Sequence, residues 1–149
     1  MFRLSCFRKI IHTALFVIGF FPVAVIACSC KEVTLEQQFS QAEFVFTARI
    51  SRTEMTKENG SPSYIKGFFE VVEAFKGKPA PLKYVSSYFS DGECALPLQE
   101  GYTYMFFIKS DQRLNICAGS DRILLDHPRF SVVLNKLRIL KQSVKSDSR

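Results

Sequence analysis

The spacing of four cysteines constrains this chain most strongly. A long apolar run ends in Cys-Ser-Cys at residues 28–30, and two further cysteines, Cys94 and Cys117, follow much later. In an extended segment, residues i and i+2 point to the same face, so Cys28 and Cys30 present both sulfurs to one side. A bond between these two would close a very small, strained ring. We therefore expect two long-range disulfides, either Cys28 with Cys94 and Cys30 with Cys117, or the crossed pairs.

A metal site is the alternative use of these cysteines. Structural zinc sites need thiolates, and their paired cysteines are usually two to four residues apart, a spacing that Cys94 and Cys117 lack. An even number of cysteines in an oxidising compartment favours disulfides. We expect no cofactor and no metal ion held by this chain alone.

Residues 1–27 predict a signal peptide. A basic start is followed by a nearly continuous apolar run from Thr13 to Ile26, and Ala27 is a small residue of the kind found at cleavage sites. A membrane span is the alternative, but the uncharged stretch from Ile10 to Ala27 holds only 18 residues, which is short for a span. We expect secretion into an extracellular or periplasmic space, with a mature chain that begins at Cys28.

The mature chain is expected to form one domain. Removing 27 of the 149 residues leaves 122, enough for one core but hardly for two. The signal segment also removes three of the 20 basic residues and none of the 14 acidic ones, so the formal charge falls from +6 to +3. This charge does not predict a nucleic-acid partner. We place the domain at residues 28–142 and a flexible tail at residues 143–149.

Two-fold alternation of apolar residues predicts strands. It is clearest over residues 43–50 and 102–108, and aromatic and β-branched residues indicate further strands at 64–75, 82–89 and 114–117. The polar residues 54–63 predict a loop, and a turn is expected near residues 110–112. The mature chain should therefore be mainly β, as a five-stranded antiparallel barrel like the oligonucleotide- and oligosaccharide-binding (OB) fold.

Two helices should flank these strands. Residues 32–42 carry Leu35 and Phe39 at helical spacing after Thr34, a candidate cap. A longer amphipathic helix follows Pro128, with apolar residues at offsets of 0, 3, 4, 7 and 10 from Phe130. Its apolar stripe is typical of a helix that covers a core.

The mature start carries chemistry of its own if cleavage falls before Cys28. The new α-amino group and the Cys28 carbonyl oxygen belong to one residue and can form a five-membered chelate with a metal ion. Such an amine titrates near pH 8, so a metal can displace its proton near neutrality. A catalytic zinc ion keeps an open coordination position that this group can fill.

Several segments in order resemble one family. "CSCKEV", "AEFVFTARI", "FFEVVEAFKG", Cys94 followed by "LQEGYTYMFFI", and "ICAGS" resemble the N-terminal inhibitory domain of the tissue inhibitors of metalloproteinases, within the netrin-like modules. The resemblance covers nearly all of the mature chain up to about Gly119. It implies disulfides of Cys28 with Cys94 and of Cys30 with Cys117. The third disulfide and the separate C-terminal domain of the animal inhibitors have no counterpart here.

The resemblance also implies a mechanism. Cys28 would bind the zinc of a target metalloendopeptidase through its amine and carbonyl, and Ser29 would enter the first primed-side pocket of that protease. The loop around Cys94, with Glu93, Ala95 and Leu96, would flank the contact. Alanine stands at position 95, where glycine is expected in many relatives.

Other functions remain as alternatives. Val25-Ile26-Ala27-Cys28 also fits a bacterial lipobox, which would make the protein an envelope lipoprotein anchored to the membrane through Cys28. A netrin-like module can also bind another exported protein without inhibiting a protease. We do not expect an enzyme, because the mature chain lacks the nucleophile-elbow, phosphate-loop and zinc-protease motifs. His127 is read as a capping or surface residue, and Asp91 with Glu93 as a solvated pair.

Overall fold

The computed structural model describes residues 30–57, 63–88, 94–124 and 127–147. The predictions for the signal segment, Cys28, Ser29 and Glu93 lie outside these residues. Among the helices of the described ranges, none combines the length and the apolar composition needed to cross a membrane.

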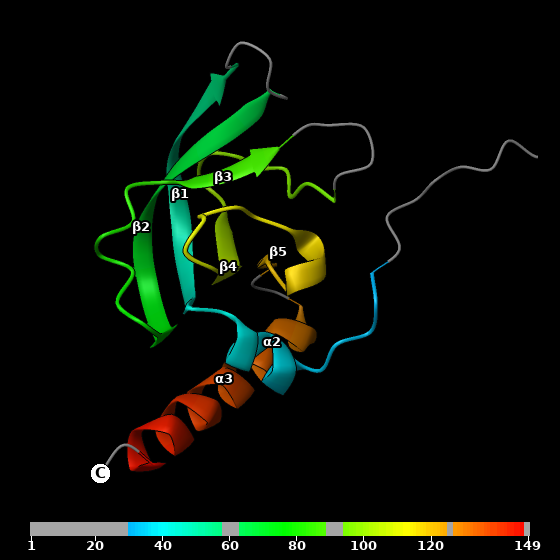
Figure 1. Ribbon diagram of the computed structural model, residues 1–149, viewed down its shortest axis with the longest axis vertical. Coiled ribbons are helices and arrows are strands. Elements are labelled where there is room, and N and C mark those ends of the chain that lie inside the picture. Colours follow the sequence, from blue (N-terminus) through cyan, green and yellow to red (C-terminus); the bar gives the residue numbers. More distant parts are fainter. Residues whose placement is uncertain (1–29, 58–62, 89–93, 125–126, 148–149) are drawn as a thin grey trace, which may run out of the picture.

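The described residues form one five-stranded antiparallel sheet with the strand order β3-β2-β1-β4-β5 (Figure 1). Its strands are β1 (Phe44–Thr56), β2 (Tyr64–Lys76), β3 (Val85–Tyr88), β4 (Thr103–Ile108) and β5 (Asp121–Arg122). The central strand β1 pairs with both β2 and β4. This confirms the prediction of a mainly β, antiparallel fold.

Among the described residues the five strands form an open sheet, so the predicted OB-like barrel is not confirmed. One isolated parallel bridge joins Ser86 of β3 to Arg113. It consists of a hydrogen bond of 3.0 Å from the Ser86 amide to the Gln112 carbonyl and one of 2.8 Å from the Leu114 amide to the Ser86 carbonyl. The pairing stops there because Gln112 has a φ of 58° and a 3₁₀ helix begins at Ile116.

Strand β1 is buried on both faces over its first half. Phe46 and Ile50 belong to an inner cluster, whose buried members are Phe46, Ala48, Ile50, Val85, Leu96, Leu98, Tyr104, Phe106, Ile108 and Leu114. Val45 belongs to an outer cluster, whose buried members are Phe39, Ala42, Val45, Phe75, Met105, Phe107, Ile123, Phe130 and Leu137. Alternate residues of β4 divide between the clusters in the same way, which confirms the predicted two-fold pattern.

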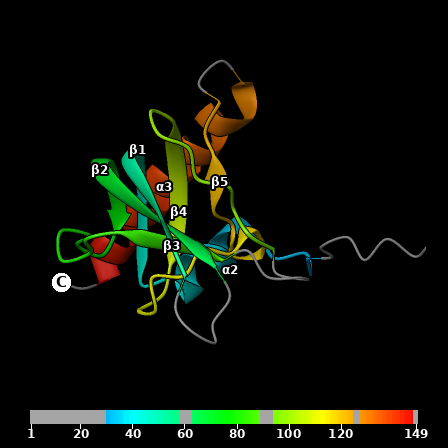
Figure 2. The same ribbon diagram turned by 90° about the horizontal axis from the view of Figure 1, so that it is seen from above.

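Two helices cover the outer cluster. Helix α2 (Leu35–Gln41) begins with a capping box in which the Thr34 side chain accepts a hydrogen bond from the Gln37 amide. Helix α3 (Pro128–Asp147) passes across the strands in the view from above (Figure 2). Phe130 and Leu137 of its apolar stripe are buried against the sheet. The covering role predicted for this helix is confirmed.

Several boundaries differ from the prediction. Strand β1 continues to Thr56, because its polar end pairs with the start of β2 and does not form a loop. Residues 114–117 form no strand. Helix α3 runs to Asp147, so residues 143–147 are helical instead of a flexible tail. Strand β5 was not predicted, since its two residues carry no periodic signal.

Charged contacts fasten α3 to the rest of the domain. Arg138 donates from Nε and Nη2 to the two carboxylate oxygens of Glu73 at 3.0 and 2.8 Å. Lys141 Nζ donates to the Ala74 carbonyl at 2.7 Å, and Lys136 forms an ion pair with Glu36 of α2 at 3.2 Å. The hydrogen bond from Arg138 lowers the pKa of Glu73 below its ordinary value of 4.5.

Replacing Leu137 by alanine should destabilise the domain by about 2–5 kcal/mol, because it leaves a cavity between α3 and the sheet. Leu137 has no exposed surface, whereas Ile139 on the same helix is 65% exposed. Ile139→Ala should therefore change the free energy of unfolding by no more than about 0.5 kcal/mol. Urea unfolding of both variants measures the difference, and equal losses would contradict the assigned helix face.

The contact between Glu73 and Arg138 should make stability depend on pH. Because the pKa of Glu73 is lowered in the folded state, its contribution is present above about pH 4.5 and is lost as the pH falls through the folded-state pKa. Glu73→Gln should cost up to about 1 kcal/mol near pH 7, the range of a partly exposed ion pair, and nothing at pH 2. Glu70→Gln is the control, since Glu70 has no ion pair among the described residues. Urea unfolding at several pH values tests this.

Candidate functional site

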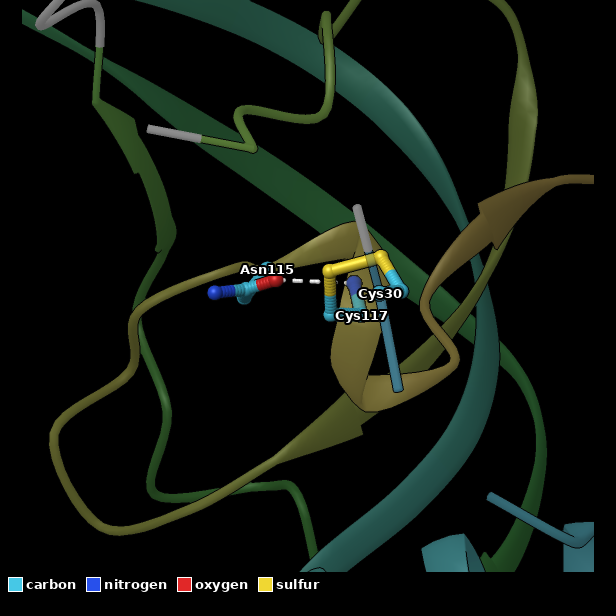
Figure 3. The surroundings of a disulfide bond; sticks show 3 residues. All are labelled: Cys30, Asn115 and Cys117. Atoms are coloured by element: carbon cyan, nitrogen blue, oxygen red, sulfur yellow. Dashed lines mark hydrogen bonds between the residues drawn. A yellow bond between two sulfur atoms is a disulfide. The ribbon is translucent and has the colours of Figure 1, made fainter. Parts of the chain in front are cut away.

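A disulfide between Cys30 and Cys117 fastens the start of the described chain to the segment after β4 (Figure 3). Their Cα atoms are 5.2 Å apart, and the bond joins residues 87 positions apart in the sequence. Of the two pairings that the cysteine spacing left open for Cys30, the structure shows the one that the family resemblance implies. The closed loop contains α2 and strands β1 to β4, whereas β5 and α3 follow it.

The segment around Cys117 folds into a 3₁₀ helix, η1 (Ile116–Ala118), which Asn115 caps. The Asn115 Oδ1 atom accepts a hydrogen bond of 2.7 Å from the Cys117 amide. Gly119 ends the helix with a φ of 100°, a conformation that favours glycine. A Cβ atom at Gly119 would also lie 2.6 Å from Oε1 of Gln38, so α2 packs directly against this turn. This explains why the predicted strand at 114–117 does not form.

Cys94 lies beside this disulfide. Its carbonyl accepts a hydrogen bond of 3.2 Å from the Ile116 amide, and the sulfurs of Cys30, Cys94 and Cys117 all lie within 4.8 Å of one another. Cys94 is itself disulfide-bonded. The structure therefore gathers at one place three of the four cysteines that the sequence singled out.

These three sulfurs have the spacing of a metal site but not its chemistry. Zinc binds cysteine as the thiolate, and a sulfur in a disulfide cannot act as one. All three are in disulfides. The cluster fastens the backbone and does not itself form a zinc site.

The predicted contact loop is only partly available at the surface. Ala95 is half-buried, but the Leu96 side chain is 4% exposed and packs in the inner cluster. The Leu96 side chain therefore belongs to the core, and its place beside a partner contact stays a prediction. The chain turns inward at this point because Leu96 and Leu98 complete the core, and the sequence neighbourhood of Cys94 does not reveal that turn.

The Tyr104 hydroxyl holds the segment after Leu96. It donates to the Pro97 carbonyl at 3.0 Å and accepts from the Gln99 amide at 3.0 Å. Burial raises the pKa of Tyr104 above its ordinary value of 10.0, so the hydroxyl keeps its proton and remains a donor. This link fixes the path of the chain from Cys94 into β4.

A hollow of about 580 Å³ lies next to the cysteines. Cys94 and Cys117 line one part of it, Gln38 and Gln41 of α2 another, and Lys109 with Arg113 supply positive charge. No sequence motif indicated this hollow, because its walls come from segments far apart in the chain.

His127 lies at the start of α3. Its Nδ1 atom accepts a hydrogen bond of 3.2 Å from the Arg129 amide, and its ring meets Phe130 edge-on. This confirms the predicted capping role of His127.

No family model and no curated protein matches the sequence. The resemblance to metalloproteinase inhibitors stays a prediction from the segments quoted above.

Removing the Cys30–Cys117 bond should strongly destabilise the domain. In the loop-entropy model, a closed loop of this length contributes about 4–5 kcal/mol. The double variant Cys30→Ser/Cys117→Ser removes both thiols, so neither can mispair. Its free energy of unfolding in urea should fall by roughly that amount. Peptide mapping without reductant should recover a peptide that links residues 30 and 117 from the unsubstituted protein only, and its absence there would contradict the pairing.

Proposed function

We propose that the exported protein inhibits a zinc metalloendopeptidase through a mature N-terminus at Cys28. The amine and carbonyl of Cys28 chelate the zinc of the target, and Ser29 enters the adjacent primed-side pocket. The protein is not an enzyme and carries no cofactor of its own in this proposal. Its partner is a protease or another exported protein.

The position of Cys30 carries this proposal. Cys30 is held by the disulfide to Cys117, beside the Cys94 segment. An extended chain spans at most about 3.6 Å per residue, so an N-terminus at Cys28 would begin within roughly 7 Å of this anchor. Chain ends normally fray, whereas a pinned end loses little conformational entropy on binding. This geometry suits a terminus that must meet a metal ion in one orientation.

The second disulfide of the proposal joins Cys28 to Cys94. Cys94 is disulfide-bonded, and neither Cys30 nor Cys117 is its partner. Of the remaining cysteines, Cys6 lies in the predicted signal segment, so Cys28 is the one left in the mature chain. A lipid on the Cys28 sulfur would prevent this bond, which is why we favour a free terminus over the lipoprotein alternative.

The order of the strands supports an OB-like arrangement for this domain. The sheet order β3-β2-β1-β4 and the parallel bridge from Ser86 to Arg113 bring the segment after β4 alongside β3. We propose that this is a barrel in which the closing strand is reduced to a single bridge. Within it, Glu93 and Ala95 remain the proposed residues beside the contact of Cys28 and Ser29 with the protease, and Leu96 supports that loop from the core.

Adding one alanine before Cys28 should abolish inhibition. The added residue converts the amine into an amide, which cannot complete the chelate, and metal coordination contributes several kcal/mol. We expect the inhibition constant against the most sensitive member of a zinc endopeptidase panel to rise at least about 100-fold. Adding one alanine after Arg149 is the matched control and should leave inhibition unchanged.

Intact mass and N-terminal sequencing of the native protein must accompany this assay. A chain that begins at Cys28 with four oxidised cysteines and no acyl group is expected. A lipid on Cys28 would establish the lipoprotein alternative. A free terminus with no inhibition of any protease in the panel, or equal inhibition by the extended chain, would favour a binding module that does not use its amine.

A further inference from the structure

A continuous row of cations and aromatic rings crosses β1, β2 and β3 and reaches Arg113. We call it the cation–aromatic row. Its cations are Arg52, Lys66 and Arg113. Its rings are those of Phe68, Tyr84, Tyr64 and Tyr88.

Each cation of the row lies over a ring. The Arg52 guanidinium is 4.1 Å from the centre of the Phe68 ring, and the Arg113 guanidinium is 4.1 Å from that of Tyr88. Lys66 Nζ lies 5.0 Å from the Tyr84 ring. These distances are within the range of cation–π attraction.

The rings also contact one another, which makes the row continuous. Tyr64 and Tyr88 stack with their centres 4.8 Å apart, and Lys66 Nζ lies 5.6 Å from the Tyr64 ring. Phe68 and Tyr84 meet at 6.1 Å. Strand register produces this arrangement, since Tyr64 is paired with Tyr88 and Phe68 with Arg52.

Two of the three cations have no ion pair within the part of the chain that the structure describes. Arg52 forms an ion pair with Glu54, but Lys66 and Arg113 form none with any residue in the described ranges. The Asp111 carboxylate nearest in sequence to Arg113 accepts from the Arg113 amide. In the described ranges the Glu54 carboxylate, which lies opposite Lys66 in the register of β1 and β2, bonds Arg52, so the charges of Lys66 and Arg113 lie over rings without an ion pair.

This part of the sheet is also outside the cover of the helices. α2 and α3 pack on the outer cluster, whose β2 member is Phe75, at the opposite end of β2 from Tyr64. Figure 1 shows β3 crossing β2 well away from both helices. Side chains of the row are exposed or half-buried, apart from Tyr64.

We infer that the cation–aromatic row binds a linear acidic polysaccharide through its sulfate or carboxylate groups. Residues 64 to 68 of β2 span about 13 Å, so the cations are spread along a line and not gathered at one point. A line of separated positive charges complements a chain with regularly spaced negative charges. Stacking on rings restricts the cation side chains before binding, which lowers the entropy cost of contact.

A polysaccharide fits the row better than a nucleic acid does. Binding of single-stranded nucleic acid uses aromatic faces on which bases stack, and here cations already cover faces of Phe68, Tyr84 and Tyr88. The formal charge of +3 for residues 28–149 is also modest for that role. This inference does not depend on inhibition of a protease.

The test uses the full mature protein and two probes, heparin as a sulfated chain and polygalacturonate as a carboxylated chain. Titration calorimetry at physiological ionic strength should show binding to at least one of them, and binding should weaken as salt is raised. Arg113→Gln and Lys66→Gln should each weaken binding about tenfold, as expected for the loss of one charge-assisted contact. Lys78→Gln removes the same charge from an exposed residue outside the row and should change binding less than about twofold.

Thermal unfolding of each variant shows whether it is folded. Two separate row variants are used so that the test still holds if one of them does not fold. The chain with an alanine added before Cys28 should bind polysaccharide as well as the unmodified chain, which separates this surface from the inhibitory end. Absence of binding to both probes, equal weakening by Lys78→Gln, or tighter binding to RNA or to anionic lipid vesicles would overturn the inference.

Discussion

The burial of β1 on both faces is the constraint on which the rest of the structure depends. Val45 and Phe46 are both fully buried, yet they belong to different clusters. The outer cluster is covered by the two helices, and the inner cluster is completed by residues 94–98 and β3. Because β1 also pairs with β2 and β4, it fixes the positions of all these segments at once. The cysteines meet at one end of the domain as a consequence of this arrangement.

Features with local signals were predictable from the sequence. A short stretch of sequence is enough to indicate the alternation in β1 and β4, the Thr34 cap and the apolar stripe of α3. The extension of β1 to Thr56 was missed because its last residues are polar and gain their order from pairing with β2. The 3₁₀ helix at Cys117 depends on the Asn115 cap and on Gly119, which packs against α2. The pattern of apolar residues along the sequence detects neither the extension of β1 nor this 3₁₀ helix.

The candidate sites show the same difference between features with a local signal and features that depend on long-range contacts. The family resemblance implied the bond of Cys30 with Cys117. It did not indicate that the Leu96 side chain is buried, because proximity to Cys94 in the sequence does not determine the direction of a side chain. The cation–aromatic row was missed because it needs the register between strands. Tyr64, Lys66 and Phe68 do alternate along β2, and this pattern was the one signal from which a shared face could have been found.

The bridge between Ser86 and Arg113 has a further consequence for the behaviour of the protein at high concentration. An unpaired strand edge is a template on which a second molecule can add its own strand. Here the free side of β3 is only four residues long, and the backbone of Ser86 is already engaged on it. At the other side of the sheet, β5 has two residues. Among the described residues, neither of these two outermost strands offers a second molecule a long ladder of free backbone groups.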